Sequence, residues 1–143
     1  MAVNKSNLVI HVDVYTENFK GPIGVGGTIK YGHEGIPFLT RINKDLTIND
    51  AHVYAILFAL KMARSIGFES LTIISPRQTV INDINKRLKS CNDTPYCDKL
   101  RKALSSEPFV GKTTFLFEVS PETSVAYSLG KLAYTFDVTN LAL

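Results

Sequence analysis

The first predicted strand is marked by apolar residues at every second position between Leu8 and Val14, with His11 and Asp13 among the residues between them. A period of two is the spacing of a β-strand. Two more strand-like runs follow at 25–31 and 36–42, each preceded by a short turn that contains glycine. Three strands joined by short turns predict an antiparallel meander.

The hydrophobic period then changes from two to that of a helix. Apolar residues recur at helical spacing as far as Ile66, with Asn49 or Asp50 as the expected N-cap and Gly67 in the position after the last turn that glycine favours. The remaining expected elements are a strand at 71–74 stopped by Pro76, a helix at 78–90, a loop at 91–95, a helix at 98–104, a strand at 113–119 and a helix at 123–134. This order predicts a mixed sheet flanked by helices in a single domain spanning 1–143.

The composition adds little to this picture. The chain has 143 residues, of which 45% are hydrophobic and 20% charged, and this is ordinary for a soluble globular protein. No apolar run approaches the ~20 residues of a membrane span, and the polar segment 1–7 does not resemble a signal peptide, so we expect a cytoplasmic protein. The net charge of +3 permits a nucleic-acid partner without indicating one.

Cysteine and histidine give no clear metal motif. Cys91 and Cys97 are expected to be reduced thiols, although a loop disulfide or a shared metal site stays open. The three histidines, His11, His33 and His52, lack the spacing of a zinc site.

Four segments resemble a known family. The run 11–29 contains V-D-V and then G-P-I-G-V-G, and is similar to the V-D-G and G-P-x-G-x-G opening of bacterial and archaeal ribonucleases H. The run 47–57 resembles the family's T-N-N-x-A-E-x-x-A-L helix start, 67–78 its strand ending in T-D-S, and 129–133 its closing A-D-x-L-A helix. The likeness covers about 8–134 and is greatest to the short stand-alone ribonuclease H-like proteins of Gram-positive bacteria. It implies an α/β ribonuclease H-like fold, with a mixed five-stranded sheet of three antiparallel strands and then parallel additions.

The resemblance also implies where an active site would lie. Such enzymes hold two Mg²⁺ ions with carboxylates on the first strand, the first helix, the end of the fourth strand and the last helix. In this chain the four positions are Asp13, His52, Pro76 and Gly130, or Ser128 in place of Gly130 if the register slips. One carboxylate of four is therefore retained. Two closely spaced Mg²⁺ ions need several oxygen ligands and negative charges, so we do not expect two-metal hydrolysis.

The retained residues have alternative interpretations. Asp13 can be a buried polar residue hydrogen-bonded to His11 or His52, or it can bind Mg²⁺ or Mn²⁺ weakly; no other cofactor is expected. His52 is expected to be neutral and structural, but an Asp13–His52 pair could hold one Zn²⁺ or Mn²⁺ ion. Asp50 is expected to be a helix cap rather than a ligand.

The densest basic region offers a possible nucleic-acid contact. It comprises Lys86, Arg87, Lys89, Lys99, Arg101 and Lys102. These side chains can contact phosphates, or they can simply be the solvated faces of amphipathic helices. The apolar tail 136–143 can pack on the sheet or on a second subunit, so an oligomer is possible.

Three functions follow from these observations. The first is a pseudoenzyme that binds an RNA–DNA hybrid or another double-stranded nucleic acid without two-metal cleavage. The second is a protein-interaction or scaffolding domain. The third is a divergent metal-dependent ribonuclease H with a rebuilt site around Asp13 and His52.

Overall fold

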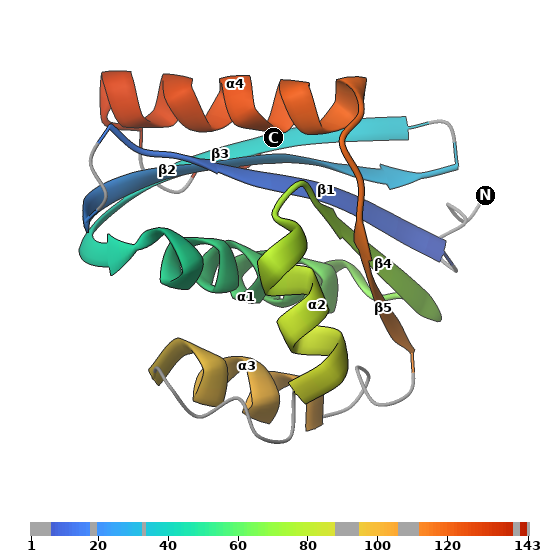
Figure 1. Cartoon of the computed structure of the whole chain (residues 1–143). Helices are drawn as coiled ribbons and strands as arrows, with labels where there is room; N and C mark the ends of the chain where they lie inside the picture. The colour runs from blue at the N-terminus through green and yellow to red at the C-terminus, as the bar shows by residue number, and fades with distance from the viewer. Residues whose placement is uncertain are drawn as a thin grey trace.

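A mixed β-sheet forms the centre of the molecule, with helices on both of its faces (Figure 1). The computed structural model describes residues 7–17, 20–32, 34–87, 95–105, 112–138 and 141–142. The strands are β1 (Asn7–Tyr15), β2 (Lys20–Tyr31), β3 (Glu34–Thr47), β4 (Ser70–Ser75), β5 (Thr113–Phe117) and β6 (Leu141–Ala142). The helices are α1 (Ile48–Ile66), α2 (Gln78–Arg87), α3 (Pro95–Ser105) and α4 (Pro121–Phe136).

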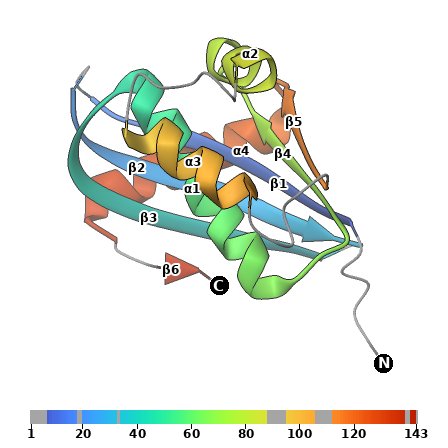
Figure 2. The ribbon, with the colours of Figure 1, turned by 90° about the horizontal axis from the view of Figure 1, so that it is seen from below.

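The strand order across the sheet is β5-β4-β1-β2-β3-β6. The first three strands pair antiparallel, while β4 and β5 add in parallel on the other side of β1. The predicted mixed five-stranded sheet is confirmed. The sixth strand, β6, pairs with β3 through Phe38 and Leu39 and lies beside it in Figure 2, so this part of the apolar tail packs on the sheet edge.

The two faces of β1 carry different chemistry. Leu8, Ile10, Val12 and Val14 are buried in the main hydrophobic cluster together with apolar residues of α1. The alternate residues face α4, since Asp13 pairs with Gly26, and Gly26 lies directly beneath that helix. As Figure 1 shows, α4 covers one side of the sheet, whereas α1, α2 and α3 lie on the opposite side.

Two glycines of β2 allow α4 to approach the sheet closely. A Cβ atom on Gly24 would lie 1.9 Å from the carbonyl oxygen of Gly130, and one on Gly26 would lie 2.3 Å from the carbonyl oxygen of Ala126. Neither separation can be tolerated by a real side chain, so the glycines at these positions are required by the packing of helix on strand.

The start of α1 differs from the prediction. Its N-cap is Thr47, whose Oγ1 accepts a hydrogen bond of 3.3 Å from the backbone N–H of Asp50, so the caps expected at Asn49 or Asp50 are wrong. The reason is that β3 runs without a loop into the helix, which leaves Thr47 as the last extended residue before the first turn. At the other end Gly67 closes the helix with a positive φ of 89°, as predicted.

Several boundaries also differ. The predicted turn at 20–24 is part of β2, because the chain stays paired with β3 across an irregularity between Gly21 and Ile23. The strand β5 ends at Phe117 rather than at 119, because Ser120 and Thr123 form a capping box that starts α4 at Pro121. The expected extension of α2 to 90 lies outside the described residues. Within the described part of the chain, no helix is both long and apolar enough to cross a membrane.

Candidate functional site

The ends of two parallel strands and the first turns of α4 enclose an open pocket of about 320 Å³. Its lining residues are Asp13, Pro76, Val119, Thr123, Ser124, Tyr127 and Ser128. Asp13 lies on β1 and Pro76 directly follows β4, the parallel neighbour of β1. The structure therefore brings together the first-strand and fourth-strand positions that the resemblance assigned to one site.

Asp13 is a buried carboxylate. It is 8% exposed, and its Oδ1 accepts a hydrogen bond of 2.7 Å from the backbone N–H of Val14. Burial raises the pKa of Asp13 from 3.8 to about 6, while the hydrogen bond from Val14 acts in the opposite direction. Among the described residues its hydrogen-bond partner is thus the backbone, rather than either of the histidines expected. No cation among the described residues offsets this burial, so the negative charge of Asp13 is costly.

His52 is buried in α1 and is 6% exposed. Burial, and secondly the positive charge of Arg77, lower the pKa of His52 to about 4. The imidazole is therefore neutral near pH 7, as predicted, and burial is the main cause. Arg77 is itself fixed by hydrogen bonds of 3.3 and 3.2 Å to Asn49 Oδ1. His52 is not one of the described residues that line the pocket with Asp13.

The last helix presents a different residue to the pocket from the one first assigned. Gly130 lies over β2, where a Cβ atom would be 2.9 Å from the carbonyl oxygen of Gly24. Ser128, the alternative in a slipped register, lines the pocket. Residues three and four apart share a helix face, so Thr123, Ser124 and Tyr127 point with Ser128 to the same side. These three residues were not predicted, because they lie before the segment 129–133 that carries the resemblance in this helix.

The basic residues are divided between two helices. Lys99 of α3 lines a smaller pocket with Lys44 and Lys61, together with Tyr54, Leu57 and Phe58 of α1. Lys44 also lies over the ring of Tyr54, with its Nζ 5.6 Å from the ring centroid. Arg101 and Lys102 follow in α3. Lys44 and Lys61 were not among the predicted basic residues, because they lie far from Lys99 along the chain.

Some predicted residues lie beyond what the structure describes. Lys86 and Arg87 end α2, but their side chains are outside the described part, as is the whole of Lys89. Cys91 and the side chain of Cys97 are likewise outside it. The phosphate contacts proposed for Lys86, Arg87 and Lys89 stay predictions, as does the redox state of the two cysteines.

Comparison with known proteins identifies the fold. No model of a known protein family matches the chain, and no curated protein matches it either. Solved structures of ribonucleases H1 do match over nearly their whole length. The enzyme of the halophilic archaeon Halobacterium salinarum NRC-1 has a TM-score of 0.74 and 18% sequence identity, and the alignment covers 92% of this chain and 99% of that chain. The fold of this chain is therefore that of ribonuclease H.

Two further matches are to LC11-RNase H1, isolated from compost by a metagenomic approach. One structure has a TM-score of 0.77 and 15% identity, and the alignment covers 92% of this chain and 98% of that chain. The other, in complex with an RNA/DNA hybrid, has a TM-score of 0.75 and 16% identity, with coverage of 91% and 98%.

Proposed function

We propose that this protein is a ribonuclease H-like domain that binds double-stranded nucleic acid, with an RNA–DNA hybrid as its ligand, and does not cleave it by the two-metal reaction. The observation that carries the proposal is the pocket at the ends of β1 and β4. Among its described lining residues, Asp13 alone bears a carboxylate.

The donor set of this pocket does not fit two Mg²⁺ ions. Mg²⁺ prefers an octahedral shell of oxygen ligands, and two ions a few ångströms apart need several negative charges around them. Pro76 offers no side-chain ligand, and Ser128 offers only a neutral hydroxyl. A single carboxylate supplies too little negative charge and too few ligands to hold two divalent ions.

A phosphate group fits this pocket better than it would fit a pocket rich in carboxylates. Ser124, Tyr127 and Ser128 are exposed on one side of α4 and line it. Hydroxyl groups are common donors to phosphate oxygens, and such contacts fix the register of a protein on its nucleic acid. Three of the four positions at which the family carries carboxylates hold residues without a negative charge, so these positions do not repel a backbone phosphate.

Positive charge elsewhere supports the same ligand. Lys44, Lys61 and Lys99 gather around one pocket at the junction of α1 and α3. Lysines that neutralise phosphates supply most of the affinity of non-specific nucleic-acid binding, and double-stranded RNA-containing helices are recognised largely by shape. The similarity to LC11-RNase H1, whose structure was solved with an RNA/DNA hybrid, makes the hybrid the first ligand to test.

The test is binding of a fluorescently labelled hybrid, measured by anisotropy across a range of salt concentrations. Ser128→Asp places a negative charge where we expect a phosphate and should weaken binding roughly tenfold, the equivalent of ~1.4 kcal/mol. Ser128→Asn has nearly the same size without the charge and serves as the matched control. Equal binding by the two variants would mean that the phosphate does not occupy this pocket.

The other functions become outcomes of the same measurements. Absence of hybrid binding at low salt favours a protein-interaction or scaffolding domain. Metal-dependent cleavage that is lost in Asp13→Asn favours a rebuilt nuclease, but Asp13 and His52 do not line a common pocket among the described residues. A cytoplasmic location, a bacterial origin and oligomerisation stay predictions from the sequence.

A further inference from the structure

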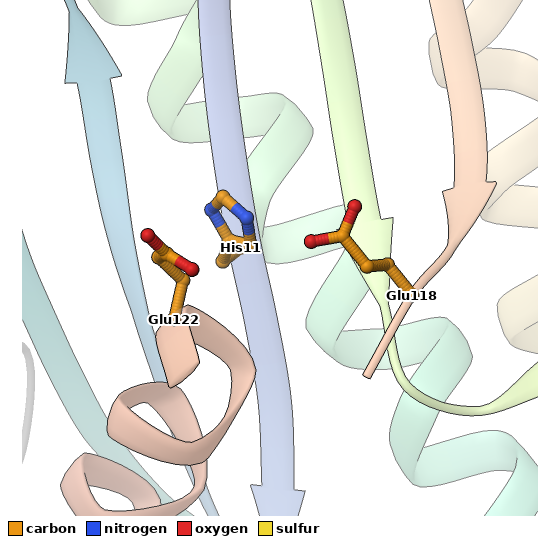
Figure 3. Close-up of side chains that lie close together, drawn as sticks. All are labelled: His11, Glu118 and Glu122. Atoms are coloured by element: carbon orange, nitrogen blue, oxygen red, sulfur yellow. The ribbon is translucent and has the colours of Figure 1, made fainter. Parts of the chain in front are cut away.

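Three potential metal ligands converge beside the pocket: His11 is distant in sequence from the other two, Glu118 and Glu122, which lie close together along the chain. His11 comes from β1, Glu118 follows β5, and Glu122 lies in the first turn of α4. One ligand atom of each residue lies within 4.8 Å of the others. Figure 3 shows the imidazole of His11 between the two carboxylates.

The histidine is the observation that points to a ligand. His11 is 6% exposed, and its Nδ1 is buried without a hydrogen-bond partner among the described residues. Buried polar atoms are nearly always paired, so an unpaired ring nitrogen in a buried histidine that lies between two carboxylates calls for an explanation.

We propose that His11, Glu118 and Glu122 bind one divalent transition-metal ion, with Zn²⁺ as the best match. Imidazole and carboxylate are both ligand types that Zn²⁺ accepts, and three protein ligands leave a fourth tetrahedral position for water. An imidazole nitrogen disfavours Mg²⁺, which prefers oxygen ligands alone. The site is separate from the position of the family's carboxylates, since Asp13 is not one of its ligands.

A neighbouring lysine competes with the metal but does not block it. Lys30 Nζ lies 3.3 Å from Oε2 of Glu122, and the two side chains are 42% and 40% exposed. An exposed ion pair of this kind contributes little free energy, because water screens it and the lysine side chain is flexible. Lys30 can therefore swing away when a metal binds. Lys30→Met should strengthen metal binding, because it removes both the competition and a nearby positive charge.

A metal ion bound at this site would link parts of the fold next to the pocket. Glu118 precedes Val119, and Glu122 precedes Thr123, and both of these neighbours line the pocket that holds Asp13. A metal bound by His11 and the two glutamates would join β1 to the segment between β5 and α4. Because a ligand that binds only the folded state stabilises it by mass action, the bound metal should raise the melting temperature.

The experiment is calorimetric titration of the full chain with Zn²⁺, Mn²⁺ and Mg²⁺, together with thermal melting in each metal. We expect one Zn²⁺ per chain, an increase in Tm with Zn²⁺ and little response to Mg²⁺. Glu118→Gln should weaken Zn²⁺ binding at least tenfold, and because Glu118 is exposed this variant should fold. His11→Gln should have the same effect. Glu69→Gln, at an exposed position before β4, is the control and should bind as the wild type does.

Other possible ligands must be separated from this site. A Cys91→Ser/Cys97→Ser variant should retain Zn²⁺ binding, and the blue-to-violet spectrum of bound Co²⁺ should lack the strong charge-transfer band of thiolate ligands. The proposal is overturned if wild-type protein binds no Zn²⁺. It is also overturned if Glu118→Gln and His11→Gln bind as tightly as the wild type, or if only the cysteine or Asp13→Asn variants lose the metal.

Discussion

Replacing Asp13 with asparagine should make the protein more stable above pH 6. The native carboxylate has a pKa of about 6, against an ordinary value of 3.8, because burial disfavours its charge. The native state therefore holds a proton more tightly than the unfolded state does. By linkage, the free energy of unfolding falls as the pH rises from about 4 to about 6, and the interval corresponds to ~3 kcal/mol.

Asparagine removes this cost and keeps the local contact. Its side-chain oxygen can still accept the 2.7 Å hydrogen bond from the N–H of Val14. We expect Asp13→Asn to raise the free energy of unfolding by up to ~3 kcal/mol at pH 7.5, and to change it little at pH 4, where the native carboxyl group is already protonated.

The assay is urea denaturation of both proteins at pH 4, 5, 6 and 7.5. Asp45→Asn, at an exposed position of β3, is the control and should stay within ~0.5 kcal/mol of the wild type throughout. A difference between wild type and Asp13→Asn that does not grow with pH would refute the reasoning. Destabilisation of Asp13→Asn at pH 7.5 would show that an unrecognised partner stabilises the carboxylate.

Three other substitutions test the fold around the site. Burial lowers the pKa of His52 from 6.5 to about 4, so the unfolded state takes up a proton at a higher pH than the native state does. The free energy of unfolding should therefore fall by ~3 kcal/mol as the pH falls through this interval. His52→Gln should remove this pH dependence in urea denaturation, whatever its effect on stability at pH 7. Gly26→Ala places a Cβ atom 2.3 Å from backbone atoms of α4 and should cost ~3 kcal/mol or more in the same assay, whereas Gly35→Ala, with its nearest contact at 3.9 Å, should be nearly neutral. Thr47→Ala removes the N-cap of α1 and should lower the free energy of unfolding by ~1 kcal/mol; no change would mean that the cap contributes nothing.

The order of the first five strands and of the helices could be predicted from the sequence, because the main elements have a clear hydrophobic period. Residues 8–14 alternate, and the helix that follows β3 keeps its apolar spacing to Ile66. The predicted boundaries of strands and helices were wrong where pairing with another strand determines the conformation in place of the local sequence. The Gly21–Pro22 pair is typical of a turn, yet pairing with β3 keeps this segment in a strand.

The candidate site could be predicted only in part. A resemblance in sequence assigned Asp13 and Pro76 to one site, and both line one pocket because their strands, β1 and β4, are parallel neighbours. The resemblance did not determine whether Gly130 or Ser128 faces the pocket, because this depends on how α4 is rotated over the glycines of β2.

The cluster of His11, Glu118 and Glu122 had no sequence signal of its own. Metal motifs are recognised by short, regular spacing, whereas His11 lies on the first strand, far in sequence from Glu118 and Glu122. Only the packing of α4 and the end of β5 against β1 brings them together.

The most direct test of the central claim is one labelled RNA–DNA hybrid incubated with the protein, assayed for binding and for cleavage with Mg²⁺ and with Mn²⁺. The account predicts binding that weakens steeply with salt, and no cleavage above the protein-free control with either metal. Rapid metal-dependent cleavage that Asp13→Asn abolishes would contradict it. So would the absence of any binding at low salt.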